Sequence, residues 1–422
     1  MFGRKVEMKR TEKDLIDLER TEFVQRVNQF FQKFNTTKID SLRVAYHLTS
    51  GQRSSIDRWI SFGLTRGVER IHLNFTSYDY VYTSKLERYV FPLLTLSKSG
   101  VSTLKHIHLQ SCILPNPPAN FSAVPFRNLR SLVLYHVHVG QDLITSLLSE
   151  CVLLEELSLI GCEFALLKLK IVSSSLLHLH FSQSFENWIT FECHKLSYLE
   201  FYGDIPPCYR DILWCCATKA PLLKRVLFNI YPTSTMPDIL ASLANLLQLE
   251  ILSLDVFQTT NISLVENSLR TIPPFKNLKE LNLFIAGELM DEELKYEFDN
   301  LWIFTILRAC PLLQKLSIMF ICPKLLANQK ENKDLGMFSH NELKVIELGG
   351  CIGNWYEIEF AMNVLKYVHT LERIIMSPFW KDPGYFGSSL YSDEEWFQNG
   401  REIVREKLHC CEKAGQAQLI LI

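Results

Sequence analysis

Apolar residues recur along the chain in one short pattern: an apolar residue, two variable residues, a second apolar residue, one variable residue and a third apolar residue. The last two apolar positions lie two residues apart, so they point to the same face of a β-strand. The pattern starts at thirteen positions separated by 20 to 36 residues: Ile39, Val68, Leu104, Leu129, Leu154, Leu176, Leu196, Leu223, Leu249, Leu278, Leu313, Leu343 and Leu371. Thirteen matches at this spacing predict a repeat protein.

A strand of this kind cannot bury its apolar face alone, whereas stacked copies share one continuous core. Most spacings are close to the roughly 20–29 residues of leucine-rich repeats. Three units also end in a cysteine where this repeat carries asparagine or cysteine, at Cys112, Cys162 and Cys351. We therefore expect an α/β leucine-rich-repeat solenoid, with a curved parallel β-sheet on its concave face and short helices and loops on its convex face.

Helical patterns separate some of the predicted strands. Residues 141–151 have apolar residues four apart, with Asp142 placed as a cap. Residues 54–67 open with Ser54-x-x-Asp57, which resembles a capping box, and end at Gly67. The residues expected to face the core are Leu143, Leu147 and Cys151 in the first helix and Ile56, Ile60 and Leu64 in the second.

The two ends depart from the repeat and suggest three regions. Residues 1–22 hold six basic and six acidic residues, and we expect a flexible, charged tail there. Residues 23–340 should form the solenoid, opened by a capping helix with Val27, Phe31 and Phe34 on one stripe. Residues 341–422 alternate between strand and helix patterns, which predicts a small α/β cap that continues the array.

Two helices and a last strand are expected in this C-terminal cap. The first helix opens at Asn354-x-x-Glu357 and the second at a Ser392-x-x-Glu395 capping box. The last strand is expected within QAQLILI, at the end of the chain. The residues expected to face inward are Ile358, Met362, Leu365 and Val368 in the first helix, and Trp396, Ile403, Val404 and Leu408 in the second.

Composition limits the classes of function. The 422 residues are 47% hydrophobic and 21% charged, with a net charge of −2. General binders of nucleic acid or anionic membranes need a large basic excess, so we expect neither partner. No apolar run approaches the ~18–20 residues of a membrane helix, and no signal-peptide pattern opens the chain. We expect an intracellular monomer, cytoplasmic or nuclear, whose twelve cysteines are free thiols.

Three stretches carry motifs of a known family. They are TEFVQRVNQFF from Thr21, IDRWISFGLTRGVERIHLNF from Ile56, and residues 343–376. In this order they are similar to the segment after the F-box, the first full repeat and the FBD core of plant F-box/leucine-rich-repeat proteins. The resemblance covers residues 21–422. It implies substrate recognition for a cullin-type ubiquitin ligase, in which the F-box docks a Skp1-type adaptor.

The F-box is the part of this family pattern that finds no counterpart here. It usually opens with Leu-Pro and contains a Trp near its end, whereas the first proline here is Pro92 and the first tryptophan is Trp59. The residues before Phe23 are charged and are not patterned for a three-helix unit. We therefore expect no direct binding to a Skp1-type adaptor.

Motifs for catalysis were sought and not found in the sequence. It contains no G-x-x-x-x-G-K-S/T, no G-x-G-x-x-G, no H-E-x-x-H and no G-x-S-x-G. Histidines occupy the variable strand positions at His72, His106, His108, His178 and His180. His72 and His108 hold the same site on adjacent strands, so a shared metal is one hypothesis. Surface histidines that tune partner binding are the favoured one.

The favoured function is non-catalytic protein binding through the concave face, without cofactor or metal. Two alternatives stay open: a ubiquitin-ligase substrate receptor whose F-box lies upstream or in a partner, and a metal-dependent enzyme. The variable positions of each strand point away from the core, and Tyr and Arg are favoured at interfaces. The candidate contact residues are Arg70, His72, Asn74, His106, His108, Gln110, Tyr135, Tyr198, Glu200, Tyr202, Arg225, Asn229, Asp255, Lys315 and Met319.

Overall fold

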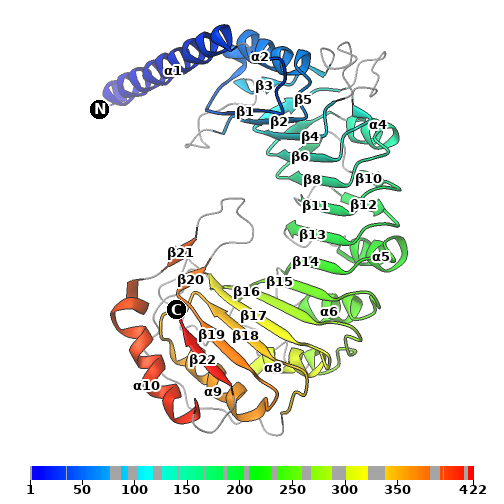
Figure 1. Ribbon diagram of the computed structural model, residues 1–422, viewed down its shortest axis with the longest axis vertical. Coiled ribbons are helices and arrows are strands. Elements are labelled where there is room, and N and C mark those ends of the chain that lie inside the picture. Colours follow the sequence, from blue (N-terminus) through cyan, green and yellow to red (C-terminus); the bar gives the residue numbers. More distant parts are fainter. Residues whose placement is uncertain are drawn as a thin grey trace. The chain divides into compact units, whose positions relative to one another are not determined.

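A parallel β-sheet runs through the repeats with its strands in chain order. The computed structural model describes residues 2–34, 36–76, 87–93, 103–116, 126–140, 142–164, 168–183, 188–203, 209–230, 235–258, 268–287, 301–321, 338–380, 390–392, 394–412 and 417–422. Fourteen strands in these ranges form the sheet in the order β1-β2-β4-β6-β8-β11-β13-β14-β15-β16-β17-β18-β19-β22 (Figure 1). The prediction of a leucine-rich-repeat fold is confirmed.

The strands of this sheet coincide with the repeated motif. Opposite residues follow the motif, as with Ile71 beside Ile107 and Leu252 beside Leu281. The strands are β1 (Ser41–Ala45), β2 (Arg70–Asn74), β4 (His106–Gln110), β6 (Ser131–Tyr135), β8 (Glu156–Ile160), β11 (His178–Gln183), β13 (Tyr198–Gly203), β14 (Arg225–Ile230), β15 (Ile251–Gln258), β16 (Glu280–Gly287), β17 (Lys315–Ile321), β18 (Val345–Gly349), β19 (Arg373–Met376) and β22 (Gln418–Leu421). The first thirteen match the thirteen predicted strands, and β22 matches the predicted last strand.

The chain divides into two units. Unit 1 comprises Met1–Ser182 and Glu186–Cys193, and unit 2 comprises Gln183–Phe185 and His194–Ile422. Unit 1 holds the helices α1 (Phe2–Lys33), η1 (Ser50–Gln52), α2 (Arg53–Thr65) and α4 (Leu143–Glu150), and the short strands β3 (Tyr89–Val90), β5 (Cys112–Leu114), β7 (His138–Val139), β9 (Glu163–Phe164), β10 (Lys168–Val172) and β12 (Trp188–Glu192). These short strands form two further sheets, β3-β5-β7-β9 and β10-β12.

Unit 2 returns from strand to strand through helices. Figure 1 shows α5 and α6 beside β14 and β15, and α9 and α10 beside the last strands. Its elements outside the main sheet are α5 (Tyr209–Lys219), α6 (Met236–Leu243), α8 (Leu301–Arg308), α9 (Trp355–Tyr367), η5 (Trp396–Gly400), α10 (Arg401–Glu412) and the antiparallel pair β20 (Phe379–Trp380) and β21 (Tyr391–Ser392). Unit 1 contains short strands in addition to helices between the strands of its main sheet.

Burial alternates along most strands as the motif requires, but several outward residues are also buried, and Ser158 is an example. Leu157 and Leu159 are both fully buried, as predicted. Ser158 between them is also buried, at 4% exposure, although its side chain points to the opposite face. Ser158 lies between Val133 on β6 and His180 on β11, whose larger side chains flank its hydroxymethyl group. Exposure at Ser158 is thus a poor test of strand register.

The cysteines that end three units behave as small core residues. Cys112, Cys162 and Cys351 are buried, and each thiol donates to a backbone carbonyl, at 3.3, 3.4 and 3.5 Å. The residue before each cysteine has a positive φ: Ser111 at 58°, Gly161 at 57° and Gly350 at 67°. A left-handed turn therefore directs the chain inward after the strand. Eight of the twelve cysteines have described side chains, and these eight are free thiols.

Helix α1 is longer than the sequence predicts. It begins at Phe2, so the stretch expected as a flexible tail is helical. Its C-terminal half packs on the first repeat, where Phe23 stacks on Tyr46 and the Trp59 indole donates to Asn28. Residues 4–33 lack proline and glycine and are rich in Lys, Arg and Glu, which are good helix formers, so no sequence signal stops the helix there.

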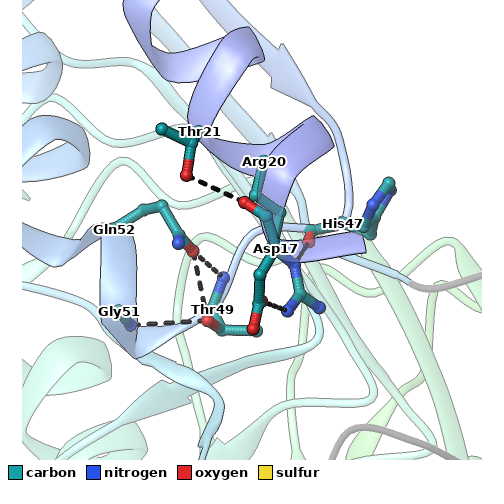
Figure 2. Close-up of polar contacts among 7 residues, drawn as sticks. All are labelled: Asp17, Arg20, Thr21, His47, Thr49, Gly51 and Gln52. Carbon is teal, nitrogen blue, oxygen red and sulfur yellow. Dashed lines mark hydrogen bonds and ion pairs between the residues drawn. The ribbon is translucent and has the colours of Figure 1, made fainter. Parts of the chain in front are cut away.

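A polar cluster fixes α1 on the loop that precedes α2. Arg20 donates to the backbone carbonyl of His47 at 2.7 Å and pairs with Asp17 at 2.8 Å (Figure 2). The same loop begins η1 with a capping box between Thr49 and Gln52. The capping box expected at Ser54 and Asp57 is therefore wrong, because the helical stretch already starts at η1.

The inward helix faces are mostly as predicted. The expected core residues of α2 and α4 are all buried, although Asp142 makes no side-chain cap. In α9 the buried stripe runs through Ile358, Ala361 and Val364, whereas the predicted Met362 and Leu365 are only half-buried. In the last helical stretch Trp396, Val404 and Leu408 are buried, but Ile403 is 41% exposed. Where a prediction fails, the buried residue is the one next to it in sequence, because each helix is rotated slightly from the orientation that the sequence pattern predicts.

Candidate functional site

The candidate residues lie on the outward face of the sheet, which carries the residues that alternate with the buried core positions. In unit 1 the strand register aligns them in rows across β2, β4 and β6. Arg70 stands beside His106, and His72 stands beside His108. A third row contains Asn74, Gln110 and Tyr135. The structure therefore brings these seven predicted residues together on three neighbouring strands.

His72 and His108 form a parallel stack. Their ring centroids are 4.1 Å apart and the planes differ by 7°. Burial lowers the pKa of His108 to about 4, helped by the nearby His72 and Arg43, and burial also lowers the pKa of His72. Both imidazoles are therefore neutral at pH 7.

The stacked geometry does not suit a shared metal ion. The lone pair of an imidazole nitrogen lies in the ring plane, so two nearly parallel rings direct their lone pairs side by side and not toward one ion. Within the described residues there is no group of three or more His, Cys, Asp or Glu side chains placed to hold a metal. The predicted proximity of His72 and His108 is thus correct, while its geometry gives no support to a shared metal.

The other histidine pair lies further along the same sheet. His178 and His180 are on β11, which follows β4 after β6 and β8, so they do not join the His72–His108 stack. Burial lowers the pKa of His180 to about 4. His180 is therefore uncharged at neutral pH.

A tyrosine–glutamate cluster occupies the start of the outward face in unit 2. Tyr198 and Tyr202 both donate their hydroxyls to Glu200, each at 2.9 Å. Burial raises the pKa of Glu200, although its two hydrogen bonds oppose that rise. Burial and the adjacent glutamate also raise the pKa of both tyrosines. The three side chains are therefore held in one fixed arrangement on β13.

The two strands beside this cluster extend it. Arg225 on β14 lies over the Tyr198 ring, 5.4 Å from the centroid, in a cation–π contact. Asn229 donates to Asp255 on β15 at 3.3 Å. Asp255 and Tyr202 are buried, at 7% and 8% exposure, so the expectation of open surface positions is wrong for these two. Asp255 lies between Asn229 on β14 and Phe284 on β16.

Lys315 and Met319 lie apart from this cluster. They are on β17, and β16 separates them from β15. Lys315 pairs with Glu347 on the next strand at 2.9 Å. Met319 stands beside Gly349, where a Cβ would come within 2.6 Å of its sulfur. These two predicted residues belong to a separate part of the outward face.

Two features escaped the sequence analysis. Arg43 holds the position on β1 that His72 holds on β2, and the repeat register alone would have placed it on the same face.

An open groove of about 500 Å³ lies between α5 and α6, and it includes the 58% exposed Trp214 and the pair Arg210–Asp238. Nothing in the strand motif predicts a groove between two helices, because their packing is a tertiary property.

None of the helices in the described part of the chain is both long enough and apolar enough to cross a lipid bilayer.

Comparison with protein-family models matches residues 32–413 to the leucine-rich-repeat domain of the plant family At1g61320/AtMIF1. The match spans β1 to β19 and includes all thirteen repeated motifs. The chain therefore belongs to this family. A search of curated proteins finds no match. Residues 343–376, which resemble the FBD core, fall inside the family match, and their assignment to an FBD region stays a prediction.

Proposed function

We propose that this member of the At1g61320/AtMIF1 leucine-rich-repeat family is a non-catalytic scaffold that binds a protein target through the outward face of its sheet. Leucine-rich repeats expose a continuous strand face whose side chains vary independently of the core, which suits recognition of extended protein surfaces. The role resembles the substrate-recognition part of F-box/leucine-rich-repeat proteins. The cytoplasm or the nucleus is the expected compartment.

The Tyr198–Glu200 pair with Arg225 is the observation that carries this proposal. Tyrosine and arginine are the residues that most often dominate binding energy at protein interfaces. Here Glu200 orients the hydroxyl of Tyr198, the buried Tyr202 holds Glu200 from the other side, and Arg225 lies over the ring of Tyr198. Side chains fixed before binding lose little conformational entropy when a partner arrives, so each contact contributes more to affinity.

Differential capture tests the proposal. The wild-type chain and the variants Tyr198→Ala, Arg225→Ala and Trp214→Ala are immobilised, and bound proteins from plant tissue are compared. We expect to find a protein that the Tyr198→Ala and Arg225→Ala variants both capture in smaller amounts than the wild type. When the affinity of the purified partner is measured, each variant should lose at least ~1 kcal/mol of binding free energy. Trp214→Ala, on the α5–α6 groove, serves as the matched control. Unchanged binding in both outward-face variants, with loss in Trp214→Ala, would move the site to the helical side.

A ubiquitin-ligase role would require an adaptor as well as a target. We infer that the 422-residue chain itself does not dock a Skp1-type adaptor. The support is that residues 2–33 form a single helix committed in its C-terminal half to the first repeat, through Phe23 and Arg20. Titration of the purified chain with a Skp1-type protein, followed by calorimetry, should give no measurable heat. Micromolar binding would contradict this inference and favour the receptor alternative.

We also infer that the chain is not an enzyme. The parallel His72–His108 stack is the arrangement nearest to a catalytic metal site in the candidate set, and its lone pairs do not converge. Elemental analysis of purified protein after exposure to zinc tests this. Stoichiometric zinc that His72→Asn and His108→Asn both remove would restore the metal hypothesis.

A further inference from the structure

The outward face of β1, β2 and β4 carries cationic and imidazole side chains but no carboxylate. Its nine positions are Ser41, Arg43, Ala45, Arg70, His72, Asn74, His106, His108 and Gln110. We call this surface the arginine–histidine patch. Arg43, Arg70 and His106 are exposed, so a partner can reach them. Two full positive charges therefore stand on one side of the sheet without compensation inside the patch.

The guanidinium groups of Arg43 and Arg70 make no ion pair with any carboxylate among the described residues. Basic side chains just before other strands behave differently, because they pair with an acidic residue of the neighbouring repeat. Lys105 pairs with Glu69 at 2.9 Å, and Lys279 pairs with Glu250 at 3.1 Å. Within the described part of the chain, the N–H donors of both guanidinium groups are therefore available to bind a ligand.

The register places these two arginines at a spacing that an extended peptide can match. Arg70 is opposite Ser41, and Arg43 is two residues further along β1. With strands ~4.8 Å apart and a rise of ~3.3 Å per residue, the two Cα atoms are about 8 Å apart. Carboxylates two residues apart on an extended chain are ~7 Å apart. Each guanidinium could then take one carboxylate in a bidentate pair.

We propose that the arginine–histidine patch binds an acidic, extended segment of a protein partner, with Arg43 and Arg70 each holding a carboxylate. This rests on the proposed function and names the chemistry of one part of the target. His72 and His108 are neutral at pH 7 and add hydrogen-bonding groups, not charge. A nucleic acid fits less well, because its binding depends on many phosphate contacts and this patch offers two full charges.

Fluorescence anisotropy with defined peptides tests the proposal. The probe is a short labelled peptide that alternates glutamate with serine, and its counterpart has glutamine in place of glutamate. We expect the glutamate peptide to bind at least tenfold more tightly than the glutamine peptide, with affinity that falls as salt rises. Arg43→Gln and Arg70→Gln should each weaken binding about threefold or more, and the double variant should lose the preference for glutamate.

Arg373→Gln is the matched control. Arg373 is an exposed arginine at an outward position of β19 in unit 2, beside Val345 and Gln418. Its substitution changes net charge equally and should leave peptide affinity unchanged. Equal loss in Arg373→Gln would show a general charge effect and overturn the proposal, as would unchanged affinity in the double variant. Circular dichroism verifies that each variant is folded, and Arg43→Lys, which keeps charge without the fork, should bind with intermediate affinity.

Two further outcomes separate this inference from the function on which it rests. If an oligonucleotide of the same charge binds the patch more tightly than the peptide, the occupant is a nucleic acid and the inference fails. If the captured protein target is lost with Tyr198→Ala but binds the Arg43→Gln/Arg70→Gln variant normally, the inference fails while the proposed function stands.

Discussion

Unit 1 and unit 2 share one strand motif but return the chain in different ways. In unit 1 the two shortest repeats start at Leu154 and Leu176 and are 22 and 20 residues long, and they return through β10 and β12. In unit 2 the repeats that start at Leu196 and Leu278 are 27 and 35 residues long, and they hold α5 and α8. A helix of two turns needs residues that these two shortest repeats lack, and they return through short strands instead.

The outward faces of the two units also differ, as do the segments that connect their strands. Unit 1 presents Arg43 and Arg70, which pair with no carboxylate among the described residues, near stacked imidazoles, whereas unit 2 presents tyrosines that donate hydrogen bonds to a glutamate. Core strand positions are mostly Leu, Ile and Val in both units, with Phe at Phe181, Phe201 and Phe228. The repeat thus fixes the scaffold, while the outward positions are free to carry different chemistry in the two units.

The largest expected effect tests whether the two units are energetically separate. Leu252 on β15 is fully buried, and Leu252→Ala should cost ~2–5 kcal/mol by removing core contacts and leaving a cavity. Because each repeat contacts mainly its neighbours, hydrogen exchange should accelerate in β13 to β16 before it accelerates in β1 to β4. Leu247→Ala, at a 54% exposed position of the same repeat, is the control. Uniform acceleration along the chain would contradict the separation.

A pair of left-handed glycines separates the cost of a steric clash from the cost of the backbone conformation: Gly350 follows strand β18, and Gly67 follows helix α2. Gly350 has a φ of +67°, and an added Cβ would come within 2.0 Å of the Phe320 carbonyl oxygen. Gly350→Ala should therefore cost about 2–4 kcal/mol, from the left-handed backbone and the clash together. Gly67 has a φ of +71°, and a Cβ added there would lie 3.9 Å from its nearest neighbouring atom. A substitution at Gly67 therefore has the cost of the left-handed backbone without a clash. Gly67→Ala should cost about 1 kcal/mol in urea unfolding, and equal costs would show that Gly350 can relax.

A buried glutamate should make unit 2 sensitive to pH. Glu357 is fully buried and accepts hydrogen bonds from the backbone N–H groups of Ile352 and Gly353 at 3.0–3.3 Å. It therefore holds the loop before α9 against the first turn of that helix. Burial raises its pKa from 4.5 to about 7 in the folded chain. The folded state then binds the proton more tightly than the unfolded state does. The stability it contributes is complete below pH 4.5 and is lost as pH rises through about 7.

The measurement is the free energy of unfolding of unit 2 in urea between pH 5 and pH 8. The shift corresponds to a loss on the order of 3 kcal/mol across that window. Glu357→Gln keeps an acceptor oxygen without the titrating group, so it should flatten the slope. Glu342→Gln, at an exposed position nearby, should leave the slope unchanged. A wild-type slope that survives Glu357→Gln would assign the pH dependence to another group.

The smallest effect concerns the ion pairs between repeats. Glu250 pairs with Lys224 at 3.5 Å and with Lys279 at 3.1 Å, and hydrogen bonding by Lys279 lowers the pKa of Glu250. These groups are largely solvated, so Glu250→Gln should cost less than ~1 kcal/mol. The loss should shrink further in high salt, as calorimetric melting in two salt concentrations can show. A larger cost would mean that cross-repeat charges hold unit 2 together.

The sequence pattern located every strand of the main sheet because the motif encodes burial directly. Leu157 and Leu159 had to face the core wherever their neighbours lay. Helix ends were predicted less well, and the start of α1 was missed entirely. Helix limits depend on caps and contacts such as Arg20 with the His47 carbonyl, which join residues distant in sequence.

The candidate site shows the same division. Strand alternation by itself places Tyr198, Glu200 and Arg225 on one face of the sheet. It does not predict that two hydroxyls share the Glu200 carboxylate, nor that Arg43, opposite His72, makes no ion pair with the described residues. Those outcomes depend on which side chains lie opposite across neighbouring strands and on how far each one reaches.

By itself the sequence determined the repeat, the strand register and the list of outward positions, because a two-residue alternation of apolar side chains is a local property of a strand. Only the tertiary structure decided which outward residues are paired, buried or free. Ser158 and Asp255 are buried, and the His72–His108 rings are stacked, because the repeats bring together strands whose facing residues lie 22 or more positions apart in the chain. Such contacts follow from the packing of whole repeats, which no short stretch of sequence contains.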